Sequence, residues 1–463
     1  MFQKSVYVNR REQLKKMMGS GLILLPGNNE MPMNYEDNTY RFRQDSTFLY
    51  FFGHDQAGLT AAIDVDNNED IFFADEFTST MILWMGSQET MAEKAQKVGA
   101  KHMPMKAFGE LIANALKKGQ RIHILPPYRA DRKIWLGELL NVHPNKVETF
   151  VSEKLLKACI KMRSIKETVE IEEIRSAMPT AYAMHTTAMK MAKPGLFERE
   201  IAGRIEGIAA SDAAGISFPI ILTKNGHILH NHVHPNELKQ GDLMVVDAGC
   251  SSFLNYATDH TRTTPVGGKF TQKQKEIYQI VLNANEAARE ATSAGVYYRE
   301  CHLIAAKTIA SGLKDLGLMK GNVDDAVAAG AHALFFPHGL GHHMGLDVHD
   351  MEDYGENLVG YDETIERSQQ FGLKSLRLGK KLETGYVITN EPGCYFIPHL
   401  IDAWQADGTN AEFLNFDKIN SYRDFGGIRL EDDILVTENG CELLGERIPI
   451  TVEEVEAMCA SGM

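Results

Sequence analysis

The sequence predicts two domains, a smaller α/β domain over residues 1–160 followed by a larger α+β domain over residues 161–463. The chain has 463 residues, more than a single hydrophobic core normally organises. Its first third alternates short strand-like runs with amphipathic stretches, and long helical patterns begin near Ser152. Hydrophobic residues make up 44% of the chain and charged residues 24%, which is enough apolar material for two cores.

The first domain is predicted from a succession of short elements. An amphipathic stretch from Arg10 to Met18 precedes an apolar run, residues 21–25, that ends at Pro26-Gly27, a pattern typical of a helix followed by a buried strand. Further strands are predicted at residues 47–52, 59–65, 70–74 and 121–125, and a helix at 90–98. This alternation indicates an α/β domain, and no side-chain cluster in it suggests chemistry.

The second domain is predicted from a change of pattern. Residues 152–192 form long amphipathic helical stretches that lead into it. After Pro194-Gly195, helical patterns alternate with strands such as 242–248 and 386–390. Residues 354–383 are polar and glycine-containing, and we expect an irregular excursion there. Together these patterns indicate a mixed α+β domain.

Composition narrows the functional class. A formal net charge of -14 argues against binding nucleic acid or an anionic membrane, which needs clustered cationic side chains. The first residues lack the apolar stretch of a signal peptide and no 18-residue apolar run follows, so a cytoplasmic location is expected. Six scattered cysteines without a CxxC pair are expected to be free thiols.

Two aspartates lie in strand-like segments of the second domain. Asp247 ends the run 243–246, where burying an unpaired carboxylate would cost several kcal/mol, so a cation is expected nearby. Asp259 follows twelve residues later, and the segment between them is long enough for a hairpin that brings both carboxylates to one point. Taken alone, such a pair more often caps a turn or forms a salt bridge.

A histidine cluster strengthens the case for a metal site. Four histidines, His338, His342, His343 and His349, occur within twelve residues that also contain three glycines. So many imidazoles on a backbone that can approach a site closely favour metal binding or proton transfer over packing. Not all four can be ligands, and their spacing does not select among them.

Two glutamates complete the candidate set. Glu391 lies at a strand end, where Pro392 blocks continuation of the strand. Arg429 and Glu431 are predicted in a single strand, and their spacing of two places both side chains on one face. Four carboxylates and one imidazole suit a carboxylate-bridged pair of divalent ions, with Mn²⁺ preferred and Co²⁺, Zn²⁺ or iron as alternatives.

The motifs VVDAG, TDHTRT, PHGLGHHMGLDVHD, NEPG and GIRLEDD occur in this order, and YRFRQDSTFLYFFG precedes them at residues 40–53. In this series the chain resembles the pita-bread metallopeptidases, and within them the Xaa-Pro aminopeptidases (aminopeptidase P) and the prolidases. The resemblance covers almost the whole chain. It implies an α/β N-terminal domain before a pita-bread catalytic domain, and a peptidase that removes the residue preceding a proline from proline-containing peptides.

The resemblance also assigns roles to individual residues. It implies two metal ions per subunit held by Asp247, Asp259, His342, Glu391 and Glu431. Asp259 and Glu431 would bridge the ions, Asp247 would bind one, and His342 with Glu391 the other. His230, His338 and His349 would contact the substrate and the transition state, whereas His343 matches no motif position and is expected to be structural. The interval between the two aspartates is one residue longer than is commonest in the family, which predicts a bulge or a longer turn.

A mechanism follows from these roles. A water activated by the metals would attack the carbonyl of the Xaa-Pro bond, with Glu391 as general base. Either His230 or His349 would stabilise the oxyanion, while His338 and Arg429 are expected to bind substrate.

Three alternatives stay open. Residues 371–377 resemble a prolidase segment whose last arginine binds the free carboxylate of a dipeptide, so Arg377 is a candidate substrate-binding residue, although a surface arginine is an equal reading. Non-catalytic relatives and the metal-independent relatives that cleave creatine are disfavoured, because this chain keeps all five ligands.

The resemblance further implies a homodimer or homotetramer in which the N-terminal domain borders the active site of a neighbour.

Overall fold

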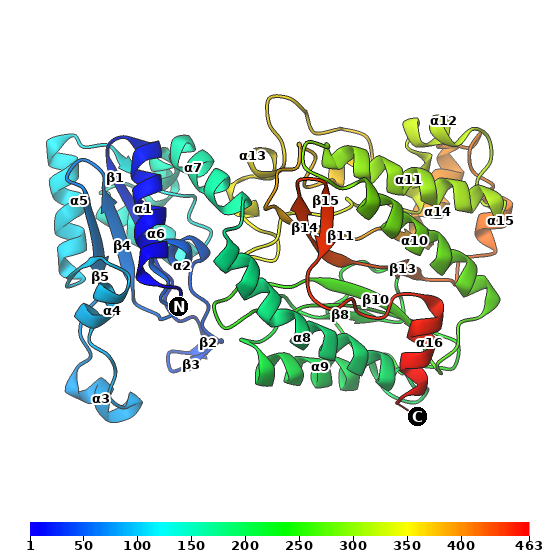
Figure 1. Cartoon of the computed structure of the whole chain (residues 1–463), viewed down its shortest axis with the longest axis horizontal. Helices are drawn as coiled ribbons and strands as arrows, with labels where there is room; N and C mark the ends of the chain where they lie inside the picture. Colours follow the sequence, from blue (N-terminus) through cyan, green and yellow to red (C-terminus); the bar gives the residue numbers. More distant parts are fainter. Residues whose placement is uncertain (463) are drawn as a thin grey trace. The chain divides into compact units, whose positions relative to one another are not determined.

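The computed structural model describes residues 1–462 as two compact units, and the second unit begins at Ser164 (Figure 1). The first unit is built around a mixed five-stranded sheet of order β6-β5-β4-β1-β7, in which β1 pairs antiparallel with β4 and parallel with β7. Its strands are β1 (Leu22–Pro26), β4 (Thr60–Asp64), β5 (Glu69–Phe73), β6 (Lys101–Met103) and β7 (Ile122–His123), and β2 (Pro32–Tyr35) forms a separate hairpin with β3 (Asn38–Thr39). Its helices are α1 (Lys4–Met18), α2 (Ser46–Phe52), α3 (Ser79–Met85), α4 (Met91–Lys97), α5 (Lys106–Lys118), α6 (Ala130–Leu139), η1 (Pro144–Phe150) and α7 (Glu153–Ser164).

One predicted strand of this unit is wrong, because residues 47–52 form most of helix α2. The Asp45 side chain accepts a hydrogen bond from the backbone N–H of Phe48, which caps the start of the helix, and Gly53 ends it in the left-handed conformation. All seven helical residues are buried, so no polar face marks a helical period. Their aromatic content has strand propensity, which tertiary burial overrides.

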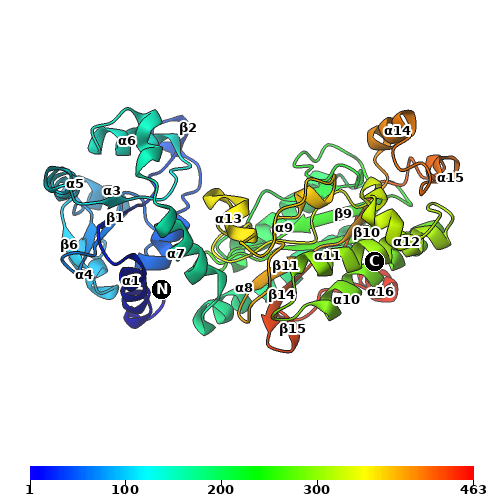
Figure 2. The same ribbon diagram turned by 90° about the horizontal axis from the view of Figure 1, so that it is seen from above.

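The second unit places strands between two helix pairs. Helices α8 (Thr168–Met191) and α9 (Glu198–Asp212) lie on one side, and α10 (Gln272–Ala291) and α11 (Tyr298–Asp315) lie on the other (Figures 1 and 2). The remaining helices are α12 (Val323–Ala328), η2 (Ala331–Leu334), η3 (Glu352–Tyr354), α13 (Glu356–Gly360), η4 (Leu373–Ser375), α14 (Pro398–Asp407), α15 (Phe416–Asn420) and α16 (Val452–Ala460). The excursion expected at residues 354–383 contains only short helices.

The strands of this unit form three small antiparallel sheets, ordered β10-β9-β8, β11-β14-β15 and β12-β13. They are β8 (Ile221–Thr223), β9 (Leu243–Ala248), β10 (His260–Pro265), β11 (Val387–Asn390), β12 (Gly393–Tyr395), β13 (Gly427–Arg429), β14 (Asp432–Thr437) and β15 (Gly440–Leu443). A bridge between Thr261 and Glu431 joins the first sheet to the segment between β13 and β14.

The single strand predicted around Arg429 and Glu431 is therefore wrong. The chain changes partner at residues 430–431, because β13 pairs with β12 whereas β14 pairs with β11. The predicted common orientation still holds, since both side chains line the same cavity.

All six cysteines are free thiols, and five of them are buried. None of the helices within residues 1–462 has the length and hydropathy needed to cross a bilayer.

Candidate active site

A cavity of about 490 Å³ opens in the second unit, where several strand ends meet the histidine-rich segment. It is lined by all ten residues singled out from the sequence: His230, Asp247, Asp259, His338, His342, His349, Arg377, Glu391, Arg429 and Glu431. Its apolar wall includes Phe218, Pro219, Leu229 and Val348. A concave site that combines an apolar wall with convergent polar groups is typical of a small-molecule or peptide site.

The hairpin of β9 and β10 brings the two aspartates together. Asp247 lies opposite Thr261, so Asp259, two residues before Thr261, points to the same face of the sheet. Register along the hairpin is regular, and the longer interval is absorbed in the loop, where Asn255 is left-handed with φ 68°. Gly249 permits this arrangement, because a Cβ atom there would lie 1.8 Å from the carbonyl oxygen of Thr258.

The histidine segment lies directly against β11. A Cβ atom at Gly341 would lie 2.1 Å from the carbonyl oxygen of Thr389, so glycine allows this approach. The backbone N–H of His342 then donates to Thr389 Oγ1 at 3.1 Å. This contact places His342 beside Glu391, the residue that follows β11.

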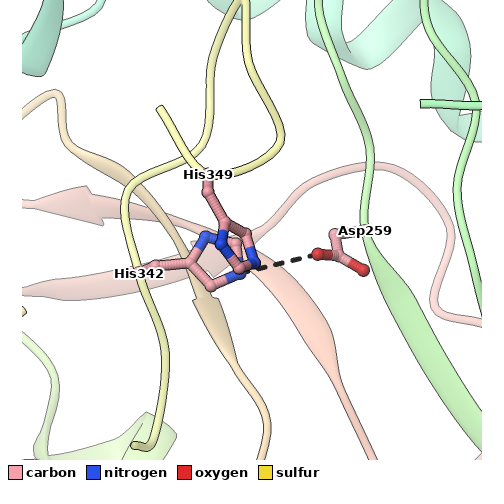
Figure 3. A group of neighbouring side chains, drawn as sticks. All are labelled: Asp259, His342 and His349. Atoms are coloured by element: carbon pink, nitrogen blue, oxygen red, sulfur yellow. Dashed lines mark ion pairs between the residues drawn. The ribbon is translucent and has the colours of Figure 1, made fainter. Parts of the chain in front are cut away.

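The five candidate ligands converge. His342 Nε2 lies 3.5 Å from Asp259 Oδ2 and 3.8 Å from Glu391 Oε1. Three overlapping groups each have ligand atoms within 4.8 Å of one another: Asp259, His342 and His349; His342, Glu391 and Glu431; and Asp247, Asp259 and Glu431. Figure 3 shows the rings of His342 and His349 lying against each other, with His342 directed toward Asp259. His342 Nδ1 donates to the carbonyl oxygen of His343 at 2.9 Å, which leaves Nε2 to face the carboxylates.

The buried carboxylates of the cluster repel one another and need cations to be stable in their ionised form. Burial and then neighbouring carboxylates raise the pKa of Asp259 and of Glu431 well above their ordinary values. Burial also raises the pKa of Glu391, although His342 and Arg429 act in the opposite direction. Oδ1 of Asp247 and Oδ1 of Asp259 are buried without a hydrogen-bond partner among residues 1–462. Unsatisfied buried oxygens from several acids fit divalent cations, which would replace the missing donors.

Arg429 and Thr261 each donate a hydrogen bond to one acid of the cluster. Arg429 Nη2 donates to Asp247 Oδ2 at 2.6 Å, and Thr261 Oγ1 donates to Glu431 Oε2 at 2.6 Å. Both contacts hold one carboxylate oxygen and leave the other for a metal.

The histidines around the cluster are held neutral. Burial lowers the pKa of His338 to about 3 and, with the nearby His342, lowers that of His349 to about 4. Burial also lowers the pKa of His230. These imidazoles therefore act at neutral pH as single donors and single acceptors.

The sequence reasoning missed three residues of the site. Tyr395 Oη lies 2.9 Å from His338 Nε2 and accepts a hydrogen bond from Arg429 Nη1. Thr261 contacts both Glu431 and Arg429, and Glu352 contacts His349. Two of them had a signal in their spacing, since Thr261 alternates with Asp259 along a strand and Glu352 lies three residues after His349. Tyr395 had none, because its partners His338 and Arg429 are 57 and 34 positions away.

This cavity of clustered carboxylates and imidazoles defines a site for divalent metal ions, and the comparisons identify the family. Residues 172–438 match "Metallopeptidase family M24", and residues 7–125 match "Aminopeptidase P, N-terminal domain". The chain belongs to metallopeptidase family M24 and combines its pita-bread domain with the N-terminal domain of aminopeptidase P. The predicted fold class and family are thereby confirmed, and the Asp/His/Glu cluster is typical of the dinuclear site of this family.

Relatives with two different activities are similar over nearly the whole chain. The human Xaa-Pro dipeptidase is 32% identical over 97% of this chain and 91% of its own length. The Escherichia coli Xaa-Pro aminopeptidase is 31% identical over 98% of this chain and 97% of its own length. The solved structure of a Pseudomonas aeruginosa aminopeptidase is 29% identical, with a TM-score of 0.81 over 100% of this chain and 99% of that chain. The chain is thus an Xaa-Pro peptidase of this family. Sequence identity alone does not separate aminopeptidase from dipeptidase activity.

Proposed function

We propose that the chain is a dinuclear metal aminopeptidase that hydrolyses the Xaa-Pro bond at the N-terminus of peptides. The convergence of five ligand side chains in one cavity supports this proposal. Aminopeptidase is preferred to dipeptidase because Arg377, the residue that would bind a dipeptide carboxylate, is already paired with Glu352 and Glu356.

The overlap of the ligand groups supports the proposed division of labour. Asp259, His342 and Glu431 each belong to two of the three groups, whereas Asp247 and Glu391 belong to one each. A carboxylate has two oxygens and can serve two ions, whereas the free Nε2 of His342 can serve one. This supports Asp259 and Glu431 as the shared ligands and the other three as ligands of a single ion. The mostly oxygen donor set favours Mn²⁺.

When bound, the divalent ions would polarise the scissile carbonyl and lower the pKa of the attacking water. Glu391 would take a proton from this water and pass it to the departing proline nitrogen. Glu391 lines the cavity, with its Oε2 3.8 Å from His338 Nδ1 and its Oε1 3.8 Å from His342 Nε2, which supports this role.

The hydrogen bonds separate the roles of the three imidazoles. His338 uses Nδ1 to donate to the Gly339 carbonyl and Nε2 to accept from Tyr395, so both nitrogens are engaged. His349 donates from Nδ1 to Glu352, which leaves the Nε2 lone pair as a hydrogen-bond acceptor. The ring of His230 has no hydrogen-bond partner within residues 1–462 and is the imidazole we assign to the oxyanion.

The test compares two peptides in the presence of Mn²⁺, with a chelated control. Release of free arginine from Arg-Pro-Pro, abolished by the chelator, would support the aminopeptidase. Cleavage of Gly-Pro alone would make the protein a dipeptidase and give Arg377 the carboxylate-binding role. Cleavage of neither peptide would favour a non-catalytic binding protein.

Self-association into a homodimer or homotetramer is the further part of the proposal, in which the first unit borders the active site of a neighbour. It is supported by α3, in which no residue is buried and Leu83 and Trp84 are 78% and 81% exposed. We expect Trp84→Ser to lower the molar mass measured by light scattering, and an unchanged mass would count against α3 as the contact. The cytoplasmic location stays a prediction.

A further inference from the structure

Glu352 is an acid behind the cavity wall that contacts two of the residues lining the cavity. The first residue of η3, it lies three residues after His349, and its Oε2 accepts a hydrogen bond from His349 Nδ1 at 3.1 Å. The same oxygen forms an ion pair with Arg377 Nη1. His349 and Arg377 both line the cavity, whereas Glu352 itself stands behind them.

Arg377 has a second acidic partner. Its Nη1 lies 3.3 Å from Glu356 Oε1, and Glu356 also pairs with Arg367. Two arginines and two glutamates therefore form a network without net charge. The side chains of Glu352 and Arg377 are 21% and 32% exposed, so water screens their attraction only in part.

Glu352 is ionised at neutral pH in this setting. Burial opposes its ionisation, but the hydrogen bond from His349 and the charge of Arg377 outweigh burial and lower the pKa of Glu352 below its ordinary value. Arg377 thus meets an incoming substrate with its charge already compensated.

We propose that Glu352 is a specificity-determining positioning residue that engages Arg377 and so disfavours substrates whose proline carries a free carboxylate. This inference rests on the proposed function and refines its substrate class to peptides that continue beyond the proline. The contact with His349 gives Glu352 a second effect, because it keeps the Nε2 lone pair directed into the site.

The chemical difference between the substrates is a single charge. In a dipeptide the proline ends in a carboxylate, whereas in a longer peptide the same position is a neutral amide. A carboxylate that approaches Arg377 must compete with Glu352 and Glu356 and is repelled by both. A neutral amide meets no such opposition.

The experiment uses Arg-Pro and Arg-Pro-amide, which differ only in this charge, with the full-length Mn²⁺-loaded enzyme. The quantity measured is the ratio of kcat/KM for the acid to kcat/KM for the amide. We expect Glu352→Gln to raise this ratio by about three- to tenfold, mainly through a lower KM for the acid. A loss of kcat through His349 would affect both substrates and cancel in the ratio.

Glu356→Gln is the matched control, because Glu356 contacts Arg377 but no histidine of the site. It should raise the ratio in the same direction by a smaller factor, and it tests the competition of acids for Arg377 even if Glu352→Gln does not fold. An unchanged ratio in both variants, with Glu352→Gln slowed equally on both substrates, would overturn the proposal and leave Glu352 only the role of orienting His349. A wild-type enzyme that cleaves neither substrate would instead overturn the proposed function, and this inference with it.

Discussion

At the scale of single residues, the site is defined by buried acids that lack enough protein donors. Asp247 and Asp259 each keep one buried oxygen without a partner among residues 1–462, and Glu431 is surrounded by other acids. The same deficit that would destabilise an empty site gives it affinity for cations.

Glu391→Gln tests the proton-transfer role. We expect kcat on Arg-Pro-Pro to fall by about 10²- to 10⁴-fold, the usual effect of losing a general base. Metal content, measured by elemental analysis, must stay near that of the wild type for the result to bear on catalysis. Full turnover in a metal-loaded variant would remove Glu391 from this role.

Tyr395→Phe tests the network that the sequence reasoning missed. The change removes the O–H that donates to His338 Nε2 and the oxygen that accepts from Arg429 Nη1, in a buried setting. Because a charged donor is left without its partner, we expect kcat/KM to fall by about tenfold or more. The comparison is Tyr422→Phe, a tyrosine that packs on Phe396 and Phe425 outside the cavity. Equal losses in both variants would point to general destabilisation.

Carboxylates at strand ends were predictable from the sequence, because an acid that ends an apolar run needs a partner. The choice of His342 among four histidines was not, since it depends on the approach of Gly341 to β11. Glu352 escaped notice because its importance comes from Arg377, which is 25 positions away along the chain.

At the scale of secondary-structure elements, the β9–β10 hairpin carries the geometry of the site. Its strands were predictable from apolar runs and turn residues. The break between β13 and β14 was not, because it reflects a change of pairing partner that leaves no mark on the hydrophobic pattern. Helix α2 was likewise hidden by complete burial.

Gly249→Ala tests this hairpin. The added Cβ would collide with the Thr258 carbonyl, so we expect a loss of about 2–4 kcal/mol in the free energy of unfolding together with loss of activity. Gly207→Ala in α9 is the control, because nothing lies within 4 Å of its Cβ and alanine favours a helix by about 0.5–1 kcal/mol. A Gly249→Ala protein with wild-type stability and rate would contradict the close strand approach.

At the scale of the whole molecule, each of the two units has its own core, and their stabilities can respond differently to pH. His54 of the first unit donates to the Lys94 carbonyl, and burial lowers its pKa to about 4. The unfolded chain titrates its histidines near pH 6.5, so below that pH the unfolded state binds more protons. The stability contribution of neutral His54 is therefore complete above about pH 6.5 and is lost as the pH falls toward 4.

We expect the free energy of unfolding of the first unit to decrease by up to about 3 kcal/mol between pH 6.5 and 4 through this residue. His54→Gln keeps a donor for the Lys94 carbonyl and removes the titration, so it should flatten this part of the profile. The measurement is urea unfolding of the full chain across this range. Identical pH profiles for variant and wild type would exclude His54 as the cause.

The account as a whole depends on two metal ions driving hydrolysis in the cavity of the second unit. The most direct test is to add Mn²⁺ stepwise to metal-free protein while measuring bound metal per chain and release of arginine from Arg-Pro-Pro. We predict no release without metal and a maximal rate once about two ions are bound per chain. Full hydrolysis by the metal-free protein, or saturated metal binding without any release, would contradict the central claim.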